Sequence, residues 1–231
     1  MNQVITKYNL KFFPLLLSMA LLLIIFKIDL IVPDNTGMYI LKILSVPALS
    51  VISLFIAFGK DGLIDIFSRP IKPFKNICVW YLVSLSISFV SGYVLKFIFY
   101  FDLKSNPGTE KLMETFISLP FVLLFEEVIS IFVLLVVANL LFKITKNLLL
   151  SQITGVVLSS IFFGLLHYST YFSGDMLHTL IHIIFIQGLI RIFFNLAALR
   201  SNSIIVPWIV HVIFDYTTFG IGALSALLLF M

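Results

Sequence analysis

Long apolar runs, separated by short charged or proline-containing breaks, dominate the chain. Most runs have the length that an α-helix needs to cross a hydrocarbon core, about 20 residues. The pattern therefore predicts an all-α, polytopic transmembrane helical bundle of about seven spans, within a range of six to eight. The predicted spans are Phe12 to Phe26, Met38 to Phe58, Ile77 to Phe101, Phe116 to Phe142, Leu148 to Tyr171, Met176 to Leu199 and Ile204 to Phe230.

The composition agrees with a chain that lies in a lipid bilayer. Of the 231 residues, 61% are hydrophobic and 11% are charged, whereas a soluble domain carries about 25% charged residues. The mean hydropathy is +1.14. The net charge of +4 comes from segment ends and offers no basic face for nucleic acid. A single cysteine, Cys78, excludes an internal disulfide and a cysteine-based metal cage.

Basic residues predict the orientation of the bundle. The N-terminal segment and the second, fourth and sixth connections carry Lys7, Lys11, Lys60, Arg69, Lys72, Lys75, Lys143, Lys146 and Arg200. In the alternate connections, Lys27, Lys104 and Lys111 are offset by Asp29, Asp34, Asp102, Glu110 and Glu114, and a turn is expected at residues 106–108. The positive-inside rule therefore predicts a cytoplasmic N-terminus and an external C-terminus.

Two adjacent carboxylates, Glu126 and Glu127, lie deep in the fourth predicted span. A charged side chain near the bilayer centre costs at least about 2.5–3.5 kcal/mol on insertion scales, so intramembrane carboxylates mark functional sites. Adjacent residues on a helix point about 100° apart, so one carboxylate can face a cavity while the other faces a neighbouring helix. The alternative is a pair of protonated carboxyls that serves only as hydrogen-bonded structural support.

All four histidines follow the glutamate pair, and two of them belong to short motifs. Phe163 and His167 share one helix face at i and i+4, as do His211 and Asp215. Either motif alone is weak, because an isolated membrane histidine is often an interhelical hydrogen-bond donor.

Together these motifs resemble a known family. Glu126-Glu127, then Phe163-x-x-x-His167, then the stretch from Ser203 through Pro-Trp to His211 and Asp215 is similar to the CAAX-protease and bacteriocin-processing (CPBP, or Abi) family of intramembrane proteases. The resemblance runs from about Leu119 to Asp215. It implies N-terminal transmembrane helices in residues 1–115 and a CPBP-like catalytic core in residues 116–231, within one continuous membrane domain.

The resemblance also implies roles for the site residues. Glu126 is the expected general base that activates water, Glu127 supports it, His167 and His211 bind or polarise the scissile carbonyl, and Asp215 completes the last motif. Phe163 is a supporting residue. No metal cofactor is implied, with zinc at His167 and His211 as the alternative. A buried carboxylate and two imidazoles suit peptide hydrolysis in an apolar environment.

One position departs from the family pattern. The family has an arginine four residues after the second glutamate, where this chain has Ile131. Arg191 is the only arginine inside a predicted apolar span. One hypothesis is that Arg191 replaces the missing cation as the partner of Glu127; the alternative is that Arg191 reaches the membrane interface or pairs elsewhere.

A second histidine pair, His178 and His182, follows Asp175 in the sixth predicted span. Histidines at i and i+4 can hold zinc, but a catalytic zinc needs a third protein ligand and an open position. We expect these residues to line a cavity mouth or to pair with Asp175.

Three functions remain open at this point. The first is an intramembrane endopeptidase that acts on a membrane-associated peptide or protein, in bacteriocin self-immunity or peptide processing. The composition, rich in Ile, Phe, Lys and Asn, favours a bacterial plasma membrane and argues against prenylated CAAX substrates. The second is a catalytically impaired membrane immunity or binding protein, which Ile131 favours. The third is a transporter-like carrier, although no internal repeat is found.

Overall fold

The computed structural model describes residues 1–27, 36–104 and 112–229, and within these ranges all regular structure is helical. The elements are α1 (Asn2–Lys7), α2 (Phe12–Phe26), α4 (Thr36–Ile66), α5 (Pro73–Tyr93), the π-helix η1 (Val94–Ile98), α6 (Leu112–Thr145), α7 (Leu148–Leu166), α8 (Tyr168–Tyr171), α9 (Met176–His182), the π-helix η3 (Ile183–Gly188), α10 (Leu189–Ser201) and α11 (Ile205–Leu229).

The predicted fold class is confirmed. Within the described residues, 6 helical segments are long and apolar enough to cross a membrane, namely Ile40–Ile66, Pro73–Ile98, Glu114–Thr145, Leu148–Leu166, Met176–Ser201 and Ile205–Gly222. Helix α2 is also apolar but shorter, with 15 residues. The predicted turn at 106–108, the last predicted span residue Phe230, and Asp29, Asp34, Glu110 and Lys111 lie outside the described residues.

Two predicted spans differ from the structure in ways that shape the site. Helix α7 ends at Leu166 rather than at Tyr171, and a separate turn, α8, carries Tyr171. The sixth span is not a uniform α-helix, because the π-helix η3 separates α9 from α10. π-Helical segments occur frequently at functional sites.

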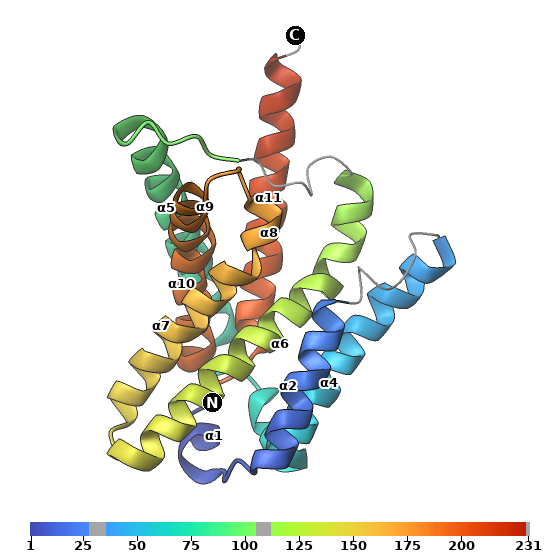
Figure 1. The fold of residues 1–231 in the computed structure, drawn as a ribbon, viewed down its shortest axis with the longest axis vertical. Helices are drawn as coiled ribbons and strands as arrows, with labels where there is room; N and C mark the ends of the chain where they lie inside the picture. The colour runs from blue at the N-terminus through green and yellow to red at the C-terminus, as the bar shows by residue number, and fades with distance from the viewer. Residues whose placement is uncertain (28–35, 105–111, 230–231) are drawn as a thin grey trace.

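Helix α6 forms the centre of the bundle (Figure 1). It packs against α4 on one side and against α7 on the other, and α11 also contacts it. Helices α5, α10 and α11 pack against one another on the α7 side, whereas α2 packs against α4. The apolar side chains of α6 make up much of the core, including Val128, Ile131, Leu134 and Leu135.

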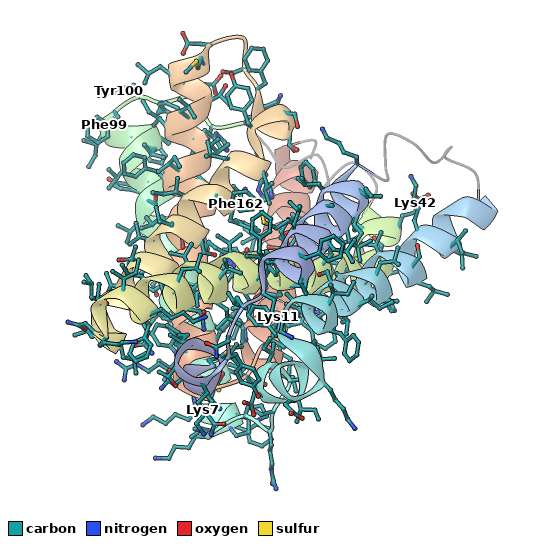
Figure 2. All side chains as sticks on the ribbon, turned by 60° about the horizontal axis from the view of Figure 1, so that its bottom comes forward. Lys7, Lys11, Lys42, Phe99, Tyr100 and Phe162 are labelled. Atoms are coloured by element: carbon teal, nitrogen blue, oxygen red, sulfur yellow. The ribbon has the colours of Figure 1, made fainter. Side chains whose placement is uncertain are left out.

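The outer surface of the bundle is apolar, as expected of a surface that faces lipid. Exposed aromatic residues directly follow η1, with Tyr100 exposed by 88% and Phe99 by 68%. Lys7 lies at the other end of the molecule (Figure 2). At that end lie α1, the α6–α7 turn and the α10–α11 turn (Figure 1), where the basic residues used to predict the orientation are concentrated.

Two glycines let the helices behind the site approach closely. A Cβ at Gly164 would lie 2.9 Å from the carbonyl oxygen of Ile183, and a Cβ at Gly188 would lie 3.1 Å from that of Ser160. Small residues allow this close packing in membrane bundles. The α7–η3 contact thereby fixes the position of Phe163, the neighbour of Gly164, relative to the start of the π-helix.

Candidate active site

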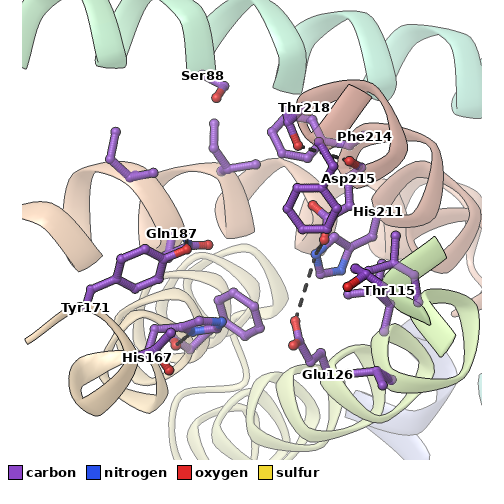
Figure 3. A pocket seen from close by; sticks show the side chains of 18 of the residues that line it. Ser88, Thr115, Glu126, His167, Tyr171, Gln187, His211, Phe214, Asp215 and Thr218 are labelled. Atoms are coloured by element: carbon purple, nitrogen blue, oxygen red, sulfur yellow. Dashed lines mark hydrogen bonds and ion pairs between the residues drawn. The ribbon is translucent and has the colours of Figure 1, made fainter. Parts of the chain in front are cut away.

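A cavity of about 570 Å³ brings the predicted site residues together (Figure 3). Glu126 of α6, Phe163 of α7, and His211 and Asp215 of α11 line it, together with His167 at the C-terminal cap of α7. Residues up to 89 positions apart in the sequence, Glu126 and Asp215, thus line the same cavity. Glu127 and Arg191 do not line this cavity but lie behind it.

The adjacent glutamates face different surroundings, as the 100° helical offset predicts. The Glu126 side chain is 24% exposed, whereas the Glu127 side chain is 0% exposed. Glu126 lines the cavity, and its side chain makes no hydrogen bond to another described residue. The Nε2 atom of His211 lies 3.9 Å from its Oε2 atom. Glu126 therefore keeps its oxygen atoms available for a water or a substrate.

Glu127 is held by two neighbouring helices. Both terminal guanidinium nitrogens of Arg191, on α10, donate to the two carboxylate oxygens of Glu127, at 2.5 and 2.7 Å. Of the two alternatives for Arg191, the structure thus has the pairing with Glu127. The Arg191 guanidinium also lies 5.0 Å from the ring centroid of Phe163, within cation–π range. The cation that Ile131 cannot supply thus comes from another helix.

Glu127 also orients His211. The Nδ1 atom of His211 lies 2.8 Å from Oε1 of Glu127. Because a carboxylate can only accept, Nδ1 carries the hydrogen. The Nε2 atom then faces the cavity, 3.9 Å from Glu126 Oε2 and 3.9 Å from Asp215 Oδ2 (Figure 3). These distances are too long for direct hydrogen bonds and leave room for a bridging water.

His167 has a defined tautomer as well. Its Nδ1 atom lies 3.0 Å from the backbone carbonyl oxygen of Phe163, which can only accept, so Nδ1 carries the hydrogen. In the neutral imidazole, Nε2 is then an acceptor. Polarisation of a substrate carbonyl by His167, as the resemblance implies, therefore needs the doubly protonated ring. A neutral His167 can accept from a water or from a substrate amide N–H instead.

A second cavity of about 550 Å³ meets the first at Glu126, Phe163 and His167, which line both. Apolar residues of α2, α4 and α6 form most of its remaining wall, including Ile25, Val46 and Phe125. The sequence did not predict this cavity. It offers apolar space directly next to the carboxylate of Glu126.

The second histidine pair is divided between two environments. His182 lines the first cavity and is 2% exposed. His178 stacks on Phe101 with ring centroids 3.9 Å apart. Asp175 caps α9, because its side chain accepts from the backbone N–H of His178 at 2.7 Å. His182 thus lines the cavity as expected, whereas His178 contacts Asp175 through its backbone N–H rather than through its ring.

The donor set for zinc is incomplete. Among the described residues, no three His, Cys, Asp or Glu side chains are grouped in a way that could hold a metal ion. The zinc alternative at His167 and His211 therefore lacks the third protein ligand that catalytic zinc sites use.

Some cavity residues were not predicted from the sequence. Tyr171 and Gln187 line the end of the cavity opposite Asp215 (Figure 3). A signal for Tyr171 was present, because it follows His167 by the same four residues that separate His167 from Phe163. Gln187 carried no such signal, because its position depends on the π-helix.

Comparison with known proteins gives one family. A family model described as "Type II CAAX prenyl endopeptidase Rce1-like" matches residues 108–217. This range holds Glu126, Glu127, His167 and His211, and also Asp215. No curated protein and no solved structure gives a significant match.

Proposed function

Because residues 108–217 belong to the Rce1-like CAAX prenyl endopeptidase family, we propose that this membrane protein is an intramembrane endopeptidase in which Glu126 activates water. The observation that carries the proposal is the partly exposed carboxylate of Glu126, which faces His211 and Asp215 across a cavity that His167 also lines. A buried, paired Glu127 beside an accessible Glu126 separates the structural carboxylate from the reactive one.

The proposed reaction begins with a water molecule held by Glu126. The carboxylate takes a proton from this water while the water oxygen attacks the carbonyl carbon of the substrate peptide bond. The electron pair of the C=O bond moves to the oxygen, which becomes an oxyanion. When the C–N bond breaks, Glu126 returns the proton to the leaving nitrogen, and the products are a carboxylic acid and an amine.

The neighbouring residues position the reactants. Glu127 fixes His211 so that Nε2 points to the cavity, next to the site of the attacking water. Asp215 adds negative charge on the other side of that imidazole. His167 accepts a hydrogen bond through Nε2 and orients either the water or the substrate amide. Positioning of this kind supplies a large share of enzymatic rate enhancement.

The substrate we propose is a membrane-associated peptide with an apolar segment. Two cavities meet at Glu126, so a peptide cut there would extend into both, with apolar residues in the cavity lined by α2 and α4. The family description names prenylated CAAX substrates. The bacterial character of the composition favours an unprenylated peptide, with a role in bacteriocin self-immunity or peptide processing at the plasma membrane.

The test uses the purified full-length chain in liposomes. Two fluorogenic probes are compared: a farnesylated CAAX peptide and an unprenylated, apolar membrane peptide. We expect Glu126→Gln, His167→Ala and His211→Ala to lower the cleavage rate by at least about 100-fold. His178→Ala is the matched control, because this ring stacks on Phe101 and does not line the cavity. Cleavage that survives Glu126→Gln would overturn the proposed mechanism.

A binding protein without catalysis is the second candidate, and Ile131 is the feature that favours it. The Arg191–Glu127 pair weakens this argument, because the second glutamate has its cation after all. Peptide-toxin immunity in bacteria that express each variant separates the two functions. Protection that persists in all three cavity variants would favour binding, whereas its loss at unchanged expression would favour catalysis.

A further inference from the structure

The hydroxyl group of Tyr171 has no role in the proposed reaction as written for Glu126, His167 and His211. The side chain is 3% exposed and lines the same cavity as Glu126 and His167. Its oxygen accepts a hydrogen bond from Nε2 of Gln187 at 3.0 Å. Among the described residues, no group accepts the hydroxyl hydrogen itself, so that hydrogen is available to a ligand.

Two histidine rings contact Tyr171. Its ring stacks on His182 with centroids 4.6 Å apart and an interplanar angle of 24°. The ring of His167 is tilted relative to it, with centroids 6.3 Å apart. The π-helix η3 makes this possible, since residues five apart, such as His182 and Gln187, lie one turn apart in π geometry. Both therefore reach Tyr171.

The surroundings of Tyr171 favour a hydrogen-bond donor over a phenolate. Burial raises the pKa of the Tyr171 hydroxyl, and the nearby carboxylates of Asp215 and Glu126 raise it further. The hydroxyl therefore keeps its hydrogen throughout the physiological pH range. Both carboxylates line the same cavity as Tyr171.

The reaction needs a donor of this kind. An oxyanion forms at the substrate carbonyl, and such sites normally supply hydrogen bonds that strengthen as the charge develops. Neutral His167 carries its hydrogen on Nδ1, which points to the backbone carbonyl oxygen of Phe163. Its Nε2 atom then accepts rather than donates. Tyr171 carries a buried donor into the same space.

A second polar group lies at this end of the cavity. His182 lines the cavity beside Tyr171, and its Nδ1 atom is buried without a hydrogen-bond partner among the described residues. A buried polar atom of this kind is unfavourable.

We infer that Tyr171 donates its hydroxyl hydrogen to the carbonyl oxygen of the bond being cleaved, and that Gln187 positions this hydroxyl. The inference rests on the proposed endopeptidase function. Tyr171 keeps its proton throughout: it stabilises the oxyanion while water adds, and the electron pair returns to the C=O bond when the C–N bond breaks. Glu126 alone transfers the proton from water to the leaving nitrogen.

Tyr171→Phe tests the inference, because it removes one oxygen and keeps the ring stack. With the probe that the wild type cleaves in liposomes, we expect kcat to fall by about 100-fold with little change in KM, as for loss of one oxyanion donor. Gln187→Leu should give a smaller fall in kcat. Tyr168→Phe is the matched control, since Tyr168 lies on the same short helix, makes a tilted ring contact with Phe172 and does not line the cavity.

A binding measurement separates catalysis from structure. A peptide with a phosphinate in place of the scissile amide mimics the tetrahedral intermediate, and Tyr171→Phe should weaken its binding by a factor similar to the fall in kcat/KM. The thermal unfolding midpoint should stay close to that of the wild type. An unchanged kcat, a rise in KM alone, or undiminished phosphinate binding would each overturn the inference.

Failure of the proposed function looks different. If Glu126→Gln still cleaves, or if the wild type neither cleaves the probes nor binds the phosphinate peptide, the endopeptidase mechanism itself fails, and the role of Tyr171 fails with it. If Glu126→Gln is inactive while Tyr171→Phe is fully active, only the role of Tyr171 is wrong.

Discussion

The guanidinium of Arg191 and the carboxylate of Glu127 form a fully buried bidentate pair, with donor–acceptor distances of 2.5 and 2.7 Å. Removing one partner of such a pair leaves an uncompensated charge in an apolar interior, which costs about 3–5 kcal/mol. We expect Arg191→Ala to lower the free energy of unfolding by this amount and to abolish cleavage, as measured by thermal unfolding in detergent and by the liposome assay.

A rescue variant makes this prediction specific. Residue 131 follows Glu127 by one helical turn on α6, so an arginine there lies on the same helix face. Adding Ile131→Arg to Arg191→Ala should restore much of the stability and activity. Arg200→Ala, at the exposed end of α10, should have little effect. A neutral Arg191→Ala would contradict the idea that this residue supplies the missing cation.

The adjacent glutamates should respond differently to the same substitution. Glu126 makes no close hydrogen bond, so Glu126→Gln should change the free energy of unfolding by no more than about 0.5 kcal/mol while abolishing cleavage. Glu127→Gln leaves the buried Arg191 without a counter-charge and should destabilise by about 3–5 kcal/mol. The two residues serve as controls for each other. An unstable Glu126→Gln, or a Glu127→Gln as stable as the wild type, would refute this division.

The sequence was informative where the bilayer imposes strong constraints. Apolar length predicted the bundle, because backbone groups in lipid must be satisfied within helices. The cost of a charge in an apolar span identified the glutamate pair, and the lack of any other arginine in a span made Arg191 a candidate partner of Glu127. Each inference used one residue type in one environment and needed no tertiary detail.

The remaining features depend on packing that periodicity does not encode. The break after Leu166 and the π-helix η3 place Tyr171 and Gln187 in the cavity, whereas a uniform helix in either segment would turn them elsewhere. The second cavity requires α2 and α4 to pack against α6. The tautomers of His167 and His211 follow from partners on the backbone and on another helix. Apart from the four-residue spacing of His167 and Tyr171, no local pattern contains this information.

Close packing at Gly164 gives a prediction about the α7–η3 contact. A methyl group there would lie 2.9 Å from the carbonyl oxygen of Ile183, so the two helices must separate. Gly164→Ala should cost about 1–3 kcal/mol, as overpacked substitutions do, and should lower activity by displacing Phe163.

The control for this variant is Gly92→Ala on α5. A Cβ at Gly92 meets no atom within 4 Å, and replacing glycine by alanine in a helix stabilises by up to about 1 kcal/mol. Thermal unfolding of both variants in detergent decides the matter. If Gly164→Ala were as stable as Gly92→Ala, the helices would not be in the close contact described above.

Asp215 should contribute charge rather than proton transfer. Its Oδ2 atom lies 3.9 Å from Nε2 of His211, so Asp215 acts on the imidazole without a direct hydrogen bond. Asp215→Asn keeps the shape and removes the charge. We expect a fall in kcat/KM of about 10- to 100-fold, or about 1.4–2.8 kcal/mol on the barrier, which is milder than the loss caused by Glu126→Gln. Asp102→Asn, on an exposed connection, should be neutral. If Asp215→Asn abolished cleavage while Glu126→Gln retained residual turnover, Asp215 would be the general base and Glu126 its support.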